Sequence, residues 1–192
     1  MGRTTIFTSA FSRHRDVVEA SMQHILPDVE RAGALLLRAL KAKKKVLVCG
    51  NGGSAADSQH FAAELVGRYK NEREALPAIA LTVDSSMLTS IGNDYGFEQI
   101  FSRQTEALGS KGDVLVAIST SGASRNVLEA ISAARKKKMR VVVLTGEKGK
   151  ALWRKVNVAI VVPSRETARI QEMHELIFHA WCEFIDANFL KA

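Results

Sequence analysis

The sequence predicts an α/β fold in which a parallel sheet of five strands lies between layers of helices. Five short apolar runs rich in β-branched residues recur along the chain, and segments with helical periodicity separate them. Apolar runs without polar alternation are typical of strands buried on both faces, and parallel strands need crossover connections that are usually helical. The expected architecture is therefore a doubly wound sheet, which binds ligands beyond the carboxyl ends of its strands.

The elements are expected in a regular order. Strands are predicted at residues 45–49, 78–82, 113–118, 140–145 and 158–162. Two helices should precede the sheet, around residues 12–24 and 27–42, because Pro27 suits the first turn of a helix and several leucines follow it at helical spacing. A last helix is expected from about residue 167 to 189. Such terminal helices can pack in an oligomer or on their own sheet, and the sequence alone leaves both open.

Length and composition indicate one ordered globular domain. The chain has 192 residues, 46% hydrophobic and 24% charged, with 3 Pro. It lacks the ~18–20 apolar residues of a membrane span, and residues 1–15 lack the apolar core of a signal peptide, so we expect a cytoplasmic protein that does not bind membranes. Cys49 and Cys182 lack the spacing of a structural zinc site and are expected to be buried apolar residues.

The net charge of +7 gathers in residues 41–45 and 135–140. A positive field favours anionic ligands. Both clusters, however, stand where a helix should end before a strand, and cations there complement the helix dipole. No aromatic residues interleave the charges to stack on bases, so we do not expect nucleic-acid binding.

The first predicted strand runs into a glycine-rich turn at residues 50–54, and a helix follows at once. Glycine permits positive φ and close backbone approach, while a helix N-terminus offers free N–H groups to an anion. Gly50, Gly52 and Ala55 also match a dinucleotide fingerprint loosely. That fingerprint needs an acidic residue ~20 residues further on, whereas Asp84 lies roughly thirty residues away, so we reject it.

The third predicted strand ends in Ser119-Thr120-Ser121-Gly122-Ala123-Ser124, again before a helix. Four hydroxyl groups and a glycine at a helix start can cradle a phosphate. Alternatively, Ser124 only caps the helix and the rest is a turn. Two such loops at the ends of neighbouring strands favour a phosphorylated small molecule as the ligand.

Two helical segments carry residues suited to metal binding or proton transfer. His60 and Glu64 are four residues apart and share a helix face, as half of a zinc site or as a simple surface pair. On the last helix, Gln171 and His179 lie within ~80° of each other, two turns apart. His174 occupies another strip of that helix, and spacing alone does not choose between the two histidines.

Together these motifs resemble the bacterial phosphoheptose isomerases of the SIS (sugar isomerase) family, over nearly the whole chain. The matching segments are Cys-Gly-Asn-Gly-Gly-Ser at 49–54, Gln-His-Phe-Ala-Ala-Glu-Leu at 59–65, Gly-Arg-Tyr at 67–69, Ile-Gly-Asn-Asp-Tyr-Gly-Phe at 91–97, Ile-Ser-Thr-Ser-Gly at 118–122 and Arg-Ile-Gln-Glu at 169–172. The resemblance implies a three-layer αβα SIS fold, flavodoxin-like, with extra N- and C-terminal helices. Residues 1–192 would form a single SIS domain, in which residues 1–42 pack the oligomer and residues 43–192 form the sheet and its flanking helices.

The resemblance also implies an activity and a set of site residues. These enzymes convert sedoheptulose 7-phosphate to D-glycero-D-manno-heptose 7-phosphate, the first step towards ADP- or GDP-heptose for the lipopolysaccharide core or a capsule. They are cytoplasmic homotetramers with one zinc per subunit and active sites between subunits. The implied metal ligands are His60, Glu64, Gln171 and His179, which decides against His174. The implied catalytic residues are Glu64 and His179. The implied substrate-binding residues are Asn51, Gly52, Gly53, Glu64, Asn93, Asp94, Ser119, Thr120, Ser121, Ser124 and Gln171, with the four hydroxyl residues on the phosphate and Arg68 as a further contact.

Isomerisation between a ketose and an aldose needs one proton removed from C1 and one added to C2, through an enediol-type intermediate. Glu64 is a suitable base and His179 a suitable proton carrier, and zinc would stabilise charge on the substrate oxygens. The same residues could also move the protons without a metal.

Two alternatives stay open. Some SIS proteins resemble this chain but bind the replication initiator without catalysis; these relatives lack the glutamate and the second histidine, which are present here as Glu64 and His179. An isomerase of another sugar phosphate is the second alternative.

Overall fold

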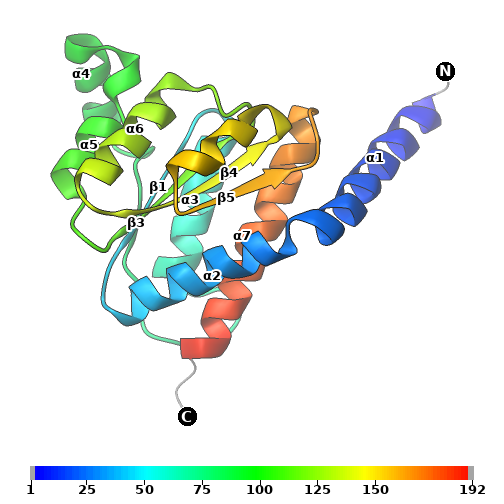
Figure 1. Ribbon diagram of the computed structural model, residues 1–192, viewed down its shortest axis with the longest axis horizontal. Coiled ribbons are helices and arrows are strands. Elements are labelled where there is room, and N and C mark those ends of the chain that lie inside the picture. Colours follow the sequence, from blue (N-terminus) through cyan, green and yellow to red (C-terminus); the bar gives the residue numbers. More distant parts are fainter. Residues whose placement is uncertain (1–2, 190–192) are drawn as a thin grey trace.

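The structure, a computed structural model, describes residues 3–189; the outermost residues of the expected domain, 1–2 and 190–192, lie outside this range. Five parallel strands form one sheet in the order β2-β1-β3-β4-β5 (Figure 1). They are β1 (Val46–Gly50), β2 (Ala78–Ala80), β3 (Val114–Ser119), β4 (Arg140–Gly146) and β5 (Val158–Val162). The expected doubly wound fold and all five predicted strands are confirmed.

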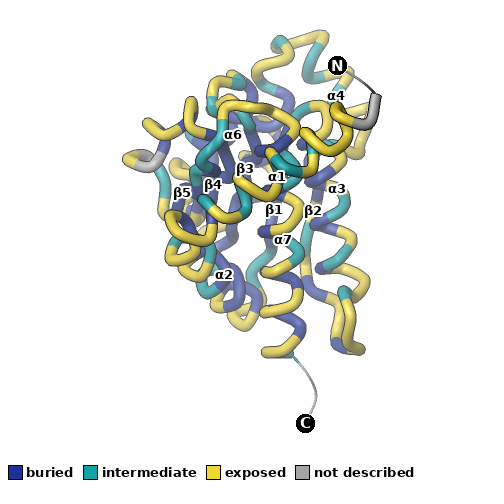
Figure 2. The backbone as a smooth tube through the Cα atoms, turned by 90° about the vertical axis from the view of Figure 1, so that its right-hand side faces the viewer, coloured by how far each residue is buried: buried dark blue, intermediate teal, exposed yellow. Residues whose placement is uncertain are grey.

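Helices cover both faces of the sheet. One face carries α2 (Leu26–Lys41), α3 (Gly53–Val66) and α7 (Thr167–Phe189), and the other carries α5 (Ser102–Leu108) and α6 (Arg125–Lys136). The remaining elements are α1 (Arg3–His24), α4 (Ser85–Tyr95) and the 3-10 helices η1 (Phe97–Gln99) and η2 (Glu147–Lys155). Figure 2 shows the strands as the buried layer between these helices.

The apolar pattern of β1 explains this layering. Val46 and Val48 pack into the core on the α2, α3 and α7 side, while Leu47 and Cys49 pack into the core on the other side. Because successive strand residues point to opposite faces, a continuous apolar run supplies both cores at once. The short edge strand β2 departs from the expectation of two buried faces, since Ile79 is 37% exposed.

The first helix is longer than predicted. It begins at Arg3 instead of around residue 12, and it projects from the body of the molecule (Figure 1). Near its middle it meets the start of α7, where Arg13 forms an ion pair of 3.0 Å with Glu166, the residue before that helix. The first half of α1 exposes large apolar side chains, with Phe7 68% and Phe11 80% exposed.

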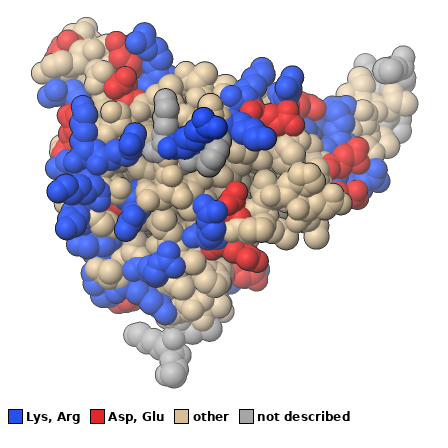
Figure 3. Space-filling view, in the orientation of Figure 1, with Lys and Arg blue, Asp and Glu red and all other residues tan. Residues whose placement is uncertain are grey.

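The two basic clusters lie at one end of the sheet. The helix α2 ends at Lys41 and α6 ends at Lys136, each shortly before a strand, as predicted. Figure 3 shows Lys and Arg side chains gathered on the side of the molecule where these helices end. Both cysteines are buried, and burial raises the pKa of the Cys49 thiol to about 12, so they behave as the apolar residues expected.

Across the described range, none of the helices combines the length and the apolar character that crossing a membrane requires.

Candidate active site

The candidate site lies where the strand order reverses. In this topology β1 and β3 are neighbours whose connections leave on opposite faces of the sheet, which opens a crevice at their carboxyl ends. The two predicted loops follow these two strands. Asn51 and Asn126 join them with a reciprocal pair of amide hydrogen bonds, each 2.8 Å from Nδ2 to Oδ1. The side chain of Asn51 therefore fixes the distance between the loops.

The loop after β1 depends on its glycines. Gly52 has φ +56° and is the N-cap of α3, and a β-carbon there would meet nothing within 4 Å. This open position exposes the start of α3, where the N–H groups of Ser54 and Ala55 already donate to the carbonyls of Asn51 and Gly52 at 3.0 Å each. Gly53 has the opposite surroundings: a β-carbon would lie 2.4 Å from the amide atoms of Gln171. Glycine at position 53 therefore lets α7 place this amide on the start of α3.

The loop after β3 brings hydroxyl groups together as predicted. The Oγ atoms of Ser119 and Ser124 are 3.1 Å apart, and Ser119 Oγ accepts the N–H of Gly122 at 3.1 Å. The tight turn requires Gly122, which has φ +66° and would clash with Gly149 if it carried a β-carbon. Ser124 caps α6 without a side-chain bond to the helix, so the capping alternative does not account for its hydroxyl group.

The helices α3 and α7 bring three metal-ligating side chains together. His60 Nε2 lies 3.2 Å from Glu64 Oε1 and 3.3 Å from His179 Nε2. One ligand atom from each of the three falls within 4.8 Å of the others, and all three side chains are partly buried. The four-residue spacing on α3 predicted the pair of His60 and Glu64, and the fold adds His179 of α7 to this pair.

Two separations in the cluster match those expected around a tetrahedral metal ion. With Zn–N and Zn–O distances of ~2.0–2.1 Å, two ligand atoms at tetrahedral corners are ~3.3 Å apart. The separations of 3.2 Å and 3.3 Å around His60 Nε2 match this edge length. Two imidazoles and one carboxylate are also a donor set that zinc commonly takes. The chain can therefore hold a metal ion here.

Gln171 lies on α7 two turns before His179 and faces the start of α3. Its Nε2 donates to Asp57 Oδ1 at 3.2 Å, which leaves its carbonyl oxygen free to accept or to ligate. Asp57 is buried on α3, and burial raises the pKa of its carboxyl group, as does the charge of Glu175, while the Gln171 bond and His60 lower it. Spacing along the sequence did not single out Asp57.

Aromatic side chains surround His179. The ring of Tyr69 stacks on His179, with centroids 5.5 Å apart and planes 26° apart. Phe178 meets the rings of both His60 and His179 edge to face, at 5.3 Å and 4.9 Å. These contacts restrict the rotation of both imidazoles. The Gly-Arg-Tyr motif was the only sequence signal that could have pointed to Tyr69.

Three of the expected substrate contacts lie apart from this crevice in the described chain. Asn93 and Asp94 are exposed on α4 and hydrogen-bond to each other at 2.8 Å. Figure 1 shows α4 at the upper left of the molecule, separate from the ribbon of α7. Arg68 is engaged in its own loop, through the carbonyl of Lys70 at 3.3 Å and Glu72 at 3.6 Å.

His174 does not join the cluster. Its side chain is fully buried, and burial lowers its pKa to about 4, partly offset by the backbone of Thr145. A neutral, enclosed imidazole of this kind belongs to the core.

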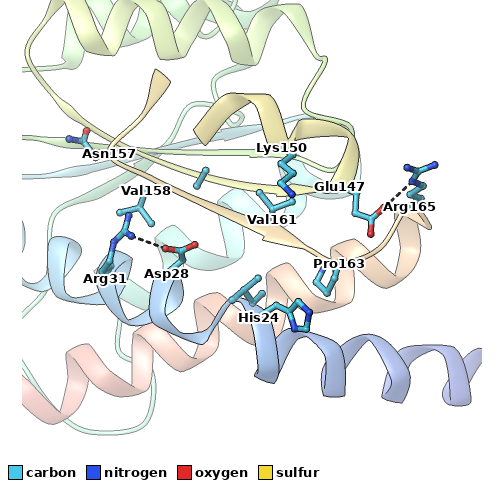
Figure 4. Close-up of a pocket in the computed structure, with 12 residues that line it drawn as sticks. His24, Asp28, Arg31, Glu147, Lys150, Asn157, Val158, Val161, Pro163 and Arg165 are labelled. Carbon is cyan, nitrogen blue, oxygen red and sulfur yellow. Dashed lines mark hydrogen bonds and ion pairs between the residues drawn. The ribbon is translucent and has the colours of Figure 1, made fainter. Parts of the chain in front are cut away.

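A second hollow of about 800 Å³ runs between α2, β5 and η2 (Figure 4). Four of the charged residues that line it form two ion pairs, Arg31 with Asp28 at 3.0 Å and Arg165 with Glu147 at 2.9 Å. It contains none of the predicted site residues.

Comparison with known proteins shows the family of the chain. Residues 11–146 match the SIS domain family, so the chain is a SIS-domain protein. It is 54% identical to phosphoheptose isomerase 1 of Campylobacter jejuni over 179 residues, which cover 93% of this chain and 96% of that protein. The solved phosphoheptose isomerase of Neisseria gonorrhoeae is 44% identical with a TM-score of 0.91, covering 97% of this chain and 100% of that one. The phosphoheptose isomerase of Francisella tularensis is 40% identical with a TM-score of 0.93, at the same coverage. The chain belongs to the phosphoheptose isomerase family, which confirms the resemblance found in its motifs.

Proposed function

We propose that this chain is an intramolecular oxidoreductase that converts sedoheptulose 7-phosphate to D-glycero-D-manno-heptose 7-phosphate. The observation that carries the proposal is the cluster of His60, Glu64 and His179 within 4.8 Å beside a hydroxyl-lined loop. A carboxylate and an imidazole are the groups that proton transfer between adjacent carbons requires. The names and the high coverage of the relatives support phosphoheptose as the substrate.

In this mechanism Glu64 removes a proton from C1 of the ketose, and an enediol-type intermediate forms. The oxygen of Glu64 that does not face His60 is the one that reaches the substrate. His179, held by Tyr69, moves a proton among the oxygens or onto C2. Stacking holds the imidazole in one orientation, so that no free energy is spent on ordering it during the reaction.

The loops supply substrate binding. Ser119, Thr120, Ser121 and Ser124 hold the phosphate; the hydroxyl groups of Ser119 and Ser124, which meet just before α6, support this role. The sugar chain then extends towards α3 and α7. Its contacts would be Asn51, Gly52, Gly53, Glu64 and Gln171.

We propose zinc as the metal, one per subunit, with His60, Glu64, Gln171 and His179 as ligands. The tetrahedral edge lengths around His60 support three of these ligands, and the free carbonyl oxygen of Gln171 supports the fourth. A bound zinc ion supplies Lewis acidity that stabilises negative charge on the substrate oxygens.

We further propose that the enzyme is a homotetramer in which residues 1–42 pack subunits together. The projecting α1 exposes Phe7 and Phe11, and α4 has no buried residue among those described. Exposed apolar surfaces of this kind are typical of subunit contacts. Active sites between subunits would give Asn93 and Asp94 of one chain access to the sugar in its neighbour. A phosphorylated substrate supports a cytoplasmic enzyme, at the start of heptose supply for lipopolysaccharide or capsule.

The test is conversion of sedoheptulose 7-phosphate by the purified protein, before and after chelation, with zinc content measured on the same sample. We expect turnover that falls on chelation and returns with zinc, and a His179→Ala variant that recovers no activity with zinc. Absence of turnover in zinc-loaded protein would contradict the proposal and favour another sugar phosphate or a binding role.

A further inference from the structure

A buried ion pair lies behind the metal-ligating cluster. Arg73, in the connection between α3 and β2, meets Asp186 of α7 with Nε 2.8 Å from Oδ1. Both side chains are only 1% exposed. Ionised groups are rarely enclosed in this way unless every donor and acceptor is used.

The guanidinium group of Arg73 caps the end of α3. Its Nη2 donates to the carbonyl oxygen of Glu64 at 2.7 Å, and its Nη1 donates to those of Leu65 at 2.9 Å and Gly67 at 3.3 Å. The last carbonyls of a helix have no partner within the helix, and a cation there also complements its dipole. One of these carbonyls belongs to Glu64 itself, so Arg73 fixes the backbone from which this side chain extends.

Asp186 holds the other half of the arrangement. Its second oxygen accepts the N–H groups of Lys70 at 2.9 Å and Asn71 at 3.0 Å. These residues directly follow Tyr69, whose ring stacks on His179. A carboxylate on α7 thus fixes the loop that carries the stacking ring, two turns along the same helix from His179.

We infer that Arg73 and Asp186 are positioning residues, which set the end of α3 and the Tyr69 loop against α7 so that Glu64 and His179 converge. This inference rests on the proposed function, since it assigns the pair a role in metal binding and proton transfer. The hydrogen bonds described for the pair join its two side chains to each other and to backbone atoms at the end of α3 and in the loop after Tyr69. The pair acts through the backbone of Glu64 and through Tyr69.

The chain contains a matched control at the opposite end of the sheet. Asp113 is also buried, and it pairs with Lys45 Nζ at 2.6 Å and accepts two backbone N–H groups, from Lys45 at 3.1 Å and Ser110 at 2.8 Å. It therefore resembles Asp186 in burial, charge and bonding. It lies before β3, at the amino ends of the strands and away from the cluster.

The experiment compares Asp186→Asn with Asp113→Asn in the full-length protein. An amide cannot accept from Arg73 and from both backbone N–H groups, so each variant loses part of its buried network while keeping its shape. A milder variant, Arg73→Lys, keeps a cation but loses the planar fork that reaches several carbonyls, and it stands in if Asp186→Asn does not fold. The measurements are the unfolding midpoint in urea, zinc affinity by competition with a chromophoric chelator, and kcat and KM for sedoheptulose 7-phosphate.

We expect the asparagine variants at both sites to lower the unfolding midpoint. Only the variants of Arg73 and Asp186 should also weaken zinc binding and kcat, each by roughly tenfold, as loss of groups that orient metal ligands does. KM should stay within about twofold, because the phosphate loop is untouched. Variants of Arg73 and Asp186 that match Asp113→Asn in zinc affinity and kcat would overturn the inference alone. If neither the wild-type protein nor Asp113→Asn binds zinc or converts the sugar, the proposed function is wrong, and this inference fails with it.

Discussion

The contact between Gly53 and Gln171 predicts that one added methyl group separates activity from stability. A β-carbon at position 53 would lie 2.4 Å from Nε2 and Oε1 of Gln171. Ordinary contacts between such atoms are ~3.5–4.0 Å, so in Gly53→Ala the amide must move by about 1 Å or more. The amide is the far end of a flexible side chain, and it can move without disturbing the core.

Activity is expected to fall while stability changes little, because the gain from replacing glycine offsets the lost hydrogen bond between Gln171 and Asp57. Gly53 is a helical residue outside the set with positive φ, so alanine fits its backbone. Replacing glycine at such a site leaves the free energy of unfolding unchanged or raises it by about 0.4–1 kcal/mol. The displaced Gln171 loses its 3.2 Å bond to Asp57 and its place beside the cluster. A misplacement of ~1 Å at a reacting site costs about 100-fold in rate, or about 2.7 kcal/mol in the activation barrier.

The assay is a double-mutant cycle on kcat/KM for sedoheptulose 7-phosphate, with urea unfolding of the same variants. If the methyl group acts through Gln171, then Gly53→Ala adds little to the loss already caused by Gln171→Ala. Full activity in Gly53→Ala would refute the placement of this amide in the site. Additive losses in the double variant would show that the methyl group acts elsewhere.

Three further predictions concern catalysis, pH and assembly. Glu64→Gln should keep the fold and oligomer yet lose at least ~100-fold in kcat, and full activity in this variant would exclude Glu64 as the base. Burial lowers the pKa of His174 in the folded protein to about 4, whereas in the unfolded chain it is about 6.5. Between these two pH values the unfolded chain therefore binds a proton at His174 that the folded protein does not. The free energy of unfolding should therefore fall by about 3 kcal/mol as the pH drops from 7 to 4. If His174→Leu lost as much stability over this pH range in urea unfolding, His174 would not be the cause. The double variant Phe7→Glu, Phe11→Glu should elute as a smaller species in size-exclusion chromatography with an unchanged circular dichroism spectrum. An unchanged elution volume would show that α1 does not form the subunit interface.

The fold was predictable because its signals are local. Each strand is a short apolar run, and each loop at a strand end shows its glycines and hydroxyl groups in consecutive residues. These patterns located β1, β3 and the crevice between them before any contact was known. The beginning of α1 was missed although Phe7 and Phe11 stand four residues apart, as on one face of a helix; both side chains are exposed, so this spacing does not mark a segment packed on the sheet.

Residues joined only by tertiary contacts were not predictable in the same way. Arg73 and Asp186 are 113 positions apart, and each looks like an ordinary charged surface residue in the sequence. Asn126 is equally unremarkable until the loops approach and its amide meets Asn51. Buried polar groups of this kind become visible only when the partner is known.

The choice between His174 and His179 shows what the packing of two helices adds. A helix turns by ~100° per residue, so rotating α7 by a few residues would exchange the strip that faces α3. That rotation is fixed in the core, where Phe61 of α3 meets Phe178 at 5.6 Å and Trp181 at 5.9 Å between ring centroids. With these aromatic residues buried against α3, His179 must emerge beside His60, and His174 must enter the core. The metal-ligating cluster is therefore a product of the apolar packing between α3 and α7, and the ligand spacing on either helix specifies only half of it.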